Sequence, residues 1–301
     1  MNALASGPPA DRSRADRASS TTLDVVLCLL LLSAAVGVLA AATPPPDGHD
    51  PRTADRAAAL LSTTTVTVDA PGGARAHGTL AALLARAALA GFHVDASDPG
   101  ADAGDLRTDG SERTTPAGAF ERTIGTRTER ALASVDASVN VTASYAPLPG
   151  SDAAGEATVG PAVPRDVDVS VARVRVPVGT GPNPTERRRA ANDDGVRGLA
   201  RTIADATLAT VLAPSPARWT LRDPAMRRTV VSRYRGLGRA LDVAPAGALA
   251  GGRVQRANAL LSRALADRYV AVARASYETP ADAADAARPR VVVLTVRTWS
   301  P

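Results

Sequence analysis

The chain has 301 residues, 45% of them hydrophobic, and its single cysteine and three histidines exclude a disulfide framework and argue against a histidine-rich metal site. All 35 basic residues are arginines, which excludes lysine-based Schiff-base chemistry and a lysine-containing phosphate-binding loop. The net charge is −6 over residues 43–160 (nine arginines, fifteen acids) and +11 over residues 161–301 (twenty-three arginines, twelve acids).

The clearest signal lies near the N-terminus, where the segment from Leu23 to Ala42 carries one charge, Asp24. A helix of about 20 residues spans the roughly 30 Å hydrocarbon core of a bilayer. Three arginines precede this segment closely, which favours a cytoplasmic N-terminus. We therefore expect a cytoplasmic segment over residues 1–22, a single transmembrane helix over residues 23–42 and an exported remainder.

Three fates are open for this apolar segment. It is an uncleaved anchor, a secretory signal cut near Ala42, or a pilin-type helix retained after removal of a short leader. The third alternative depends on Arg17 and Ala18, a basic–small pair placed before Ser19, and on Asp24 early in the helix. This arrangement resembles archaeal pilin-like leaders and implies cleavage between Ala18 and Ser19.

Beyond the apolar segment, residues 43–62 are expected to be a proline-rich linker and lead-in. The next patterns predict a half-buried strand over residues 63–69, a strong helix over residues 79–90 and a polar loop over residues 94–118. They then predict an irregular helix over residues 119–135, a strand with one solvent-facing side over residues 137–145 and a second loop over residues 147–164.

The C-terminal half begins with a regular strand over residues 166–178, whose valines change phase near Ala172, so a β-bulge is expected there. A final strand over residues 290–298 is apolar on both faces and is predicted to be central in its sheet. Three helices are predicted between these strands, over residues 187–212, 224–241 and 253–276. Residues 63–301 are thus expected to form one α+β domain.

A search for catalytic motifs is mostly negative. His93 and Asp95 could offer a base and its orienting acid, but their place at the start of a polar loop favours a surface histidine. The acids around Asp166 and Asp193 could bind a hard cation or serve a hydrolase, yet the local patterns favour solvent-facing carboxylates. We expect no catalytic, cofactor or metal site, and no small-molecule ligand is identifiable.

Two kinds of surface site are expected instead. Asn140 begins a glycosylation sequon, Asn-Val-Thr. The basic half supplies candidate contacts for an anionic partner: Arg187, Arg188, Arg189, Arg227, Arg228 and Arg235. Aromatic residues that could stack on bases are scarce, so nucleic acid is not the expected partner, and anionic lipid or an acidic protein fits better.

The residue usage, the N-terminal apolar segment and the closing strand together resemble uncharacterised membrane-anchored proteins of halophilic archaea. Those proteins are similar in turn to pilin-like accessory subunits of archaeal type IV pilus or Tad-like secretion systems. The resemblance implies a non-enzymatic envelope protein whose partners are membrane lipids and pilus or secretion-system subunits. The alternatives are an exported binding module that uses the basic half and, third, a secreted hydrolase.

Overall fold

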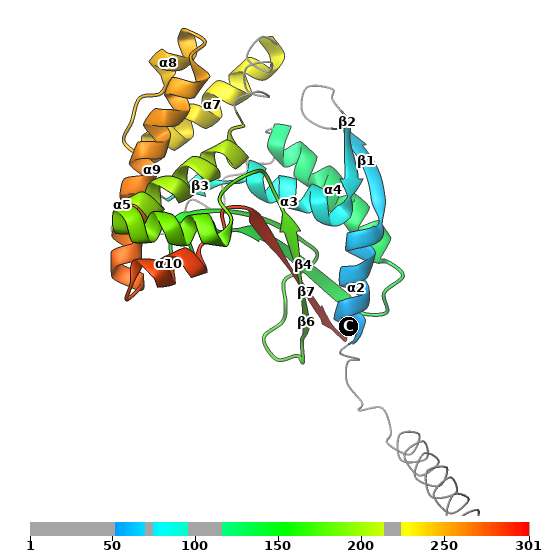
Figure 1. Ribbon diagram of the computed structural model, residues 1–301. Helices are drawn as coiled ribbons and strands as arrows, with labels where there is room; N and C mark the ends of the chain where they lie inside the picture. Colours follow the sequence, from blue (N-terminus) through cyan, green and yellow to red (C-terminus); the bar gives the residue numbers. More distant parts are fainter. Residues whose placement is uncertain (1–51, 70–74, 96–115, 214–223, 301) are drawn as a thin grey trace, which may run out of the picture. The chain divides into compact units, whose positions relative to one another are not determined.

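The computed structural model describes residues 52–69, 75–95, 116–213 and 224–300, shown in colour in Figure 1. The expected transmembrane segment Leu23 to Ala42 and the leader site at Ala18 and Ser19 lie outside these residues. Among the helices that are described, none is both long and apolar enough to cross a membrane.

One antiparallel sheet organises the described part of the chain. Its strand order is β3 (His93–Val94), β5 (Ala153–Val159), β4 (Ser138–Tyr145), β7 (Val291–Trp299) and β6 (Ser170–Pro177). Strand β7 pairs with β4 on one side and β6 on the other, which confirms the prediction of a central final strand. Together with the helices described below, this sheet confirms the α+β class.

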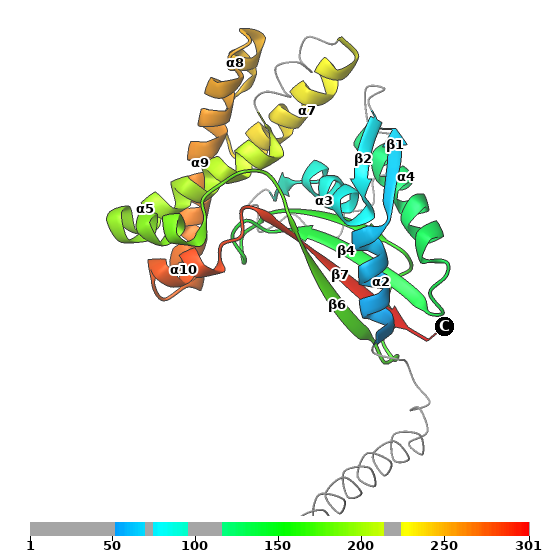
Figure 2. The ribbon, with the colours of Figure 1, turned by 45° about the vertical axis from the view of Figure 1, so that its right-hand side comes forward.

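One face of the sheet is covered by helices. Alternate residues of β7 (Val292, Leu294 and Val296) are fully buried beneath α2 (Arg52–Thr63) and α3 (Leu80–Ala90), with α4 (Pro116–Leu132) beside them (Figures 1 and 2). A hairpin of β1 (Thr65–Asp69) and β2 (Arg75–Thr79) leads into α3. Each buried leucine or valine contributes about 1.5–3 kcal/mol relative to exposure, so this layer supplies much of the core.

The start of α3 follows from one side chain. The hydroxyl of Thr79 accepts a hydrogen bond from the Ala82 amide at 3.2 Å, which satisfies one of the free donors at the helix N-terminus. The backbone N–H of Gly91 donates to the carbonyls of Ala87 and Leu89 and ends the helix. The predicted helix over residues 79–90 is therefore confirmed, including both ends.

The remaining described helices gather beyond one end of the sheet, as both ribbon views show (Figures 1 and 2). They are α5 (Pro184–Val211), α7 (Pro224–Ala240), α8 (Ala246–Ala250), α9 (Val254–Ser276) and α10 (Pro280–Ala286). Helix α5 packs along both α9 and α10. These five helices, which we call the helical lobe, contain the three helices predicted from the C-terminal half.

Helix α5 is kinked at Gly195, whose φ of 62° and ψ of −151° are not helical. Asn192, Asp193 and Asp194 immediately precede the kink and are exposed. They lie in the last turn of the first helical stretch, where the helix dipole does not stabilise carboxylates, so their predicted place at a helix N-terminal turn is wrong. Their exposure agrees with the prediction that these carboxylates face solvent.

Three sequence predictions differ from the structure. Strand β5 lies inside the predicted loop over residues 147–164, because its small residues give little β-propensity. The expected β-bulge is wrong: β6 pairs with β7 without a break from Ser170 to Pro177, and Val171 is 49% exposed. Helix α2 begins at Arg52, inside the expected linker and lead-in.

Candidate functional site

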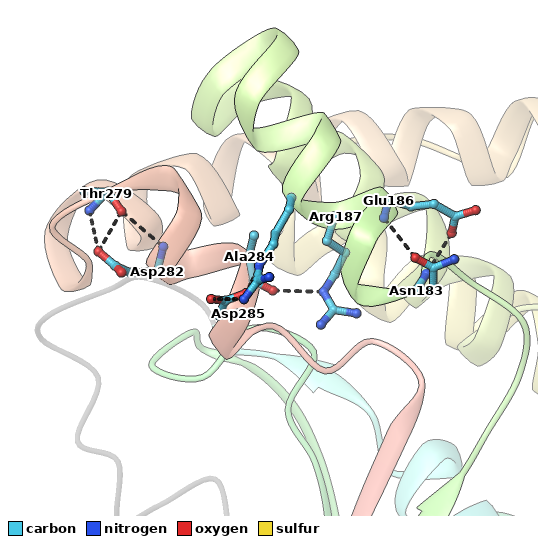
Figure 3. A network of polar contacts seen from close by, with 8 residues as sticks. Asn183, Glu186, Arg187, Thr279, Asp282, Ala284 and Asp285 are labelled. Carbon is cyan, nitrogen blue, oxygen red and sulfur yellow. Dashed lines mark hydrogen bonds and ion pairs between the residues drawn. The ribbon is translucent and has the colours of Figure 1, made fainter.

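The arginines predicted to meet an anionic partner separate into two groups, and the first is used internally. Arg187 is 9% exposed; its Nε donates to the Ala284 carbonyl at 2.9 Å and its Nη1 to the Pro182 carbonyl at 3.3 Å. Burial lowers the pKa of Arg187 below its ordinary value. Arg188 forms a two-pronged ion pair with Asp285, at 2.6 and 2.9 Å (Figure 3).

Both helices joined by these contacts begin with a capping box, also visible in Figure 3. In α5 the Glu186 amide donates to the Asn183 side chain at 2.9 Å, and the Asn183 amide donates to the Glu186 carboxylate at 2.7 Å. Thr279 and Asp282 do the same at the start of α10. Arg187 and Arg188 therefore attach α10 to α5, while the neighbouring Arg189 stays exposed.

The second group lines a cavity of about 940 Å³ along α7, which we call the α7 groove. Arg227, Arg228 and Arg235, all predicted partner contacts, lie on it together with Arg239. The other lining residues are small or apolar: Val231, Ser232, Val243, Ala244, Pro245 and Ala246. The groove thus combines four guanidinium groups with an apolar wall.

Among the described residues, no acid balances the charge of this groove. No Asp or Glu of that part of the chain lines it, and none of its four arginines forms an ion pair there. Arg235 and Arg239 are four residues apart on the same helical face, where like charges repel. An anion in the groove would relieve that repulsion, and the guanidinium group can bind phosphate or carboxylate with two hydrogen bonds at once.

A fifth arginine on the same helix points inward. Arg233 donates through Nη2 to the carbonyl of Leu89, in the last turn of α3, where a cation is favoured by the helix dipole. Burial lowers the pKa of Arg233, and its Nε has no hydrogen-bond partner among the described atoms. This contact holds the inner side of α7 while the groove arginines remain on the outer side.

Two further contacts fix α7 in place. The Tyr234 hydroxyl donates to Asn258 Oδ1 at 2.6 Å, and Asn258 Nδ2 donates to the Leu212 carbonyl at 3.1 Å. Burial raises the pKa of Tyr234 to about 12. Arg268 on α9 donates to the Ala240 carbonyl at the end of α7 at 2.8 Å and forms an ion pair with Asp152. The helix that presents the groove is thus tied to α9.

The apolar wall depends on Gly238. A Cβ atom at this position would lie 2.6 Å from both the Val243 carbonyl oxygen and Pro245 Cδ, so only glycine lets the returning chain pass this close. The Val243 amide donates to the Gly238 carbonyl at 2.8 Å and closes the turn. No sequence pattern predicts this wall. Arg239 was also missed, although it lies four residues after Arg235 and therefore on the same helical face.

Residues 23–299 match the sequence profile of DUF7284, a family of unknown function. This chain belongs to the DUF7284 family. Comparison with curated proteins and with solved structures gives no match. The matched range contains both the apolar segment Leu23 to Ala42 and all four groove arginines of this DUF7284 chain.

The remaining candidate sites of this DUF7284 chain are not assembled into reactive clusters. His93 Nε2 lies 3.4 Å from Asp95 Oδ1, but both side chains are well exposed, as the surface interpretation predicted. Asp166 and Asp193 are also exposed, whereas a hydrolase that uses these acids would be favoured by carboxylates that face into a pocket. Within the described residues no three Asp, Glu, His or Cys side chains gather closely enough to hold a metal ion.

The sequon asparagine, Asn140, is buried, whereas the sequence pattern places it on a solvent-facing side of its strand. Asn140 is 5% exposed, and its Nδ2, the atom a glycan would occupy, donates to the Pro161 carbonyl at 3.0 Å. Its Oδ1 accepts from Thr142 Oγ1 at 3.3 Å and from Arg297 Nη1 at 3.4 Å. The side of β4 that was predicted to face solvent is therefore buried at Asn140. We do not propose Asn140 as a modification site of the folded chain.

Proposed function

We propose that this chain is a membrane-held envelope protein whose α7 groove binds an anionic group of a partner. The observation that carries the proposal is the set of four groove arginines, with no carboxylate among the described residues that line the groove. Charge-assisted hydrogen bonds from arginine are stronger than neutral ones, at about 1.5–3 kcal/mol each. A multiply charged phosphate or carboxylate group is the ligand that such a set favours.

Other functions fit the groove less well. Single-stranded nucleic acid is usually held by aromatic side chains that stack on its bases, and no aromatic residue among those the structure describes lines the groove. General acid–base catalysis needs a group that titrates near the working pH, whereas the described lining of the groove offers arginine guanidinium groups and one serine hydroxyl. Binding, rather than turnover, is therefore the role that its chemistry supports.

The groove can be tested by binding of inorganic pyrophosphate to the full chain in a non-ionic detergent, measured by calorimetry. We expect R228E/R235E to bind about tenfold more weakly or worse, the loss expected for even one charge-assisted hydrogen bond. The matched control is R56E/R127E, which makes the same charge change at exposed residues of α2 and α4. Equal weakening in both variants would show that only net charge matters and would contradict the proposal.

The identity of the partner as a pilus or secretion-system subunit is proposed from the resemblance alone. Retention of the apolar segment Leu23 to Ala42 is part of the same proposal. Mass spectrometry of the mature N-terminus in membrane and medium fractions tests this part separately. A membrane-bound form that begins at Met1 or Ser19 retains the helix, whereas a form in the medium that begins near Thr43 would exclude a pilin-like component.

A further inference from the structure

The second face of the sheet, which we call the open face, carries polar and basic side chains instead of a core. Cross-strand pairs define it because opposite residues point to the same side. On β7, Val293, Thr295 and Arg297 are half-buried. Their partners on β4 and β6 complete three rows across the sheet: Ser144–Val293–Arg175, Thr142–Thr295–Arg173 and Asn140–Arg297–Val171.

Strand β6 is one edge of this sheet, and its outer edge has no strand partner within the described residues. It is much longer than β3 at the opposite edge. Its side chains alternate, with Ala172 buried on the covered face and Arg173, Arg175 and Val171 exposed on the open face. The unpaired backbone groups of such an edge can pair with another strand.

The exposed arginines decide which strand would pair there. In an antiparallel pair of two β6 strands from two copies, the open-face residues of one copy lie opposite or diagonal to those of the other. Arg173 and Arg175 would then meet their own counterparts, and directly opposed like charges are destabilising. Edge arginines therefore act against self-association and leave an acidic strand as the complementary occupant.

No acid on the neighbouring rows of β6 and β7 offsets these charges. Among the described strand residues, Glu156 is an acid on the open face. It lies on β5, and its carboxylate accepts a hydrogen bond from the Thr158 hydroxyl at 3.1 Å. Arg297 is directed towards Asn140 and Thr142, with its Nη1 3.2 Å from Thr142 Oγ1. The open face is therefore basic along β6, with the exposed Val171 at one end.

We propose that β6 accepts an extended acidic segment of a partner protein as a sixth strand. Alternate carboxylates of that segment would lie about 4.5–5.5 Å, measured between Cβ atoms, from Arg173 and Arg175. An apolar side chain of the segment would lie next to Val171. Backbone hydrogen bonds supply affinity in this mode, and the alternating side chains select the partner. The site is independent of the α7 groove and of the function proposed for it.

The test is hydrogen–deuterium exchange of the full chain in non-ionic detergent, with a synthetic peptide that alternates Thr and Glu and ends in Val. We expect slower exchange over residues 170–177 with this peptide and no such change with the matched Thr–Arg peptide. The variant R173E/R175E should show the reverse preference, since its edge is acidic. That reversal also demonstrates that the variant is folded.

The groove variant R228E/R235E should keep the β6 response, which separates this inference from the proposed function. The proposal is overturned if a saturating amount of the acidic peptide leaves exchange over residues 170–177 unchanged. It is also overturned if protection appears only on α7, or if R173E/R175E still prefers the acidic peptide.

Discussion

At the scale of single residues, the structure separates arginines that look alike in the sequence. Arg187, Arg188 and Arg189 are consecutive, yet the first is buried against α10, the second is paired with Asp285 and the third is exposed. The difference follows from their angular positions on α5 and from the location of α10. Because the location of α10 is a tertiary property, the sequence could identify the basic cluster but not which of its members are free.

Glycines are equally dependent on tertiary context. A Cβ atom at Gly155 would overlap the Ala88 carbonyl oxygen and lie 3.1 Å from Phe92 Cα, both backbone atoms, whereas Gly236 in α7 has open space around it. We predict that Gly155→Ala lowers the free energy of unfolding by about 1–3 kcal/mol through overpacking. Gly236→Ala should raise it by up to about 1 kcal/mol, because alanine favours a helix.

Urea denaturation of both variants checks this pair. A Gly155→Ala variant as stable as the unmodified chain would mean that β5 and α3 do not pack as closely as described.

At the scale of elements, strong local patterns were predicted well and weak ones were missed. The apolar run of β7 and the capped, leucine-rich α3 specify their structures locally, so both predictions hold. Strand β5, Ala153–Val159, is built mainly of small residues and is stabilised by pairing with β3 and β4 rather than by its own propensity. Its existence is a tertiary effect that periodicity could not reveal.

The valine pattern of β6 predicts a change of phase that the structure does not contain, for a related reason. Val167 and Val171 suggested a second apolar set on the strand, but Val167 precedes the strand in a bend and Val171 faces solvent. Burial of the covered face is supplied by Ala172, with Val174 and Val176 half-buried. An apolar residue on an edge strand need not face the core, and here its exposure is part of the proposed docking edge.

The kink of α5 gives a prediction for one element. Gly195 has a positive φ that other residues rarely adopt, although the space around its Cβ position is open. We expect Gly195→Ala to lower the free energy of unfolding by about 1–3 kcal/mol, the usual cost of backbone strain. Gly247→Ala in α8 is the control, since Gly247 has open space and no positive φ. Equal stability of the two variants would show that α5 straightens without cost.

At the scale of the whole molecule, the tyrosines give a common pH signal. The chain has four tyrosines, and burial raises the pKa of all of them, to about 12 for Tyr234. Because the unfolded phenol ionises near pH 10, these tyrosines leave stability unchanged below pH 10. Stability should then fall as the pH rises from 10 towards 12.

Tyrosinate absorbance and circular dichroism, followed together against pH, test this coupling. We expect both signals to change in one transition above about pH 10. Tyr234→Phe should make the loss of stability with pH shallower. Full ionisation centred on pH 10 in a chain that keeps its folded spectrum would contradict the burial of these side chains.

The organisation of the molecule combines two surfaces with positive charge. The α7 groove lies in the helical lobe and the β6 edge lies on the sheet, and both belong to the half of the chain with a net charge of +11. The charge distribution alone is compatible with pairing of the two halves, with solvated arginines or with an anionic partner. Only the fold separates arginines that bind internally from those that remain available.

The most direct test of the groove is chemical modification of arginines by phenylglyoxal in the full chain, mapped by mass spectrometry with and without pyrophosphate. We predict that pyrophosphate protects the four groove arginines, Arg227, Arg228, Arg235 and Arg239, and leaves the exposed Arg56 and Arg127 reactive. Protection that is absent, or equally strong at Arg56 and Arg127, would contradict an anion-binding site on α7.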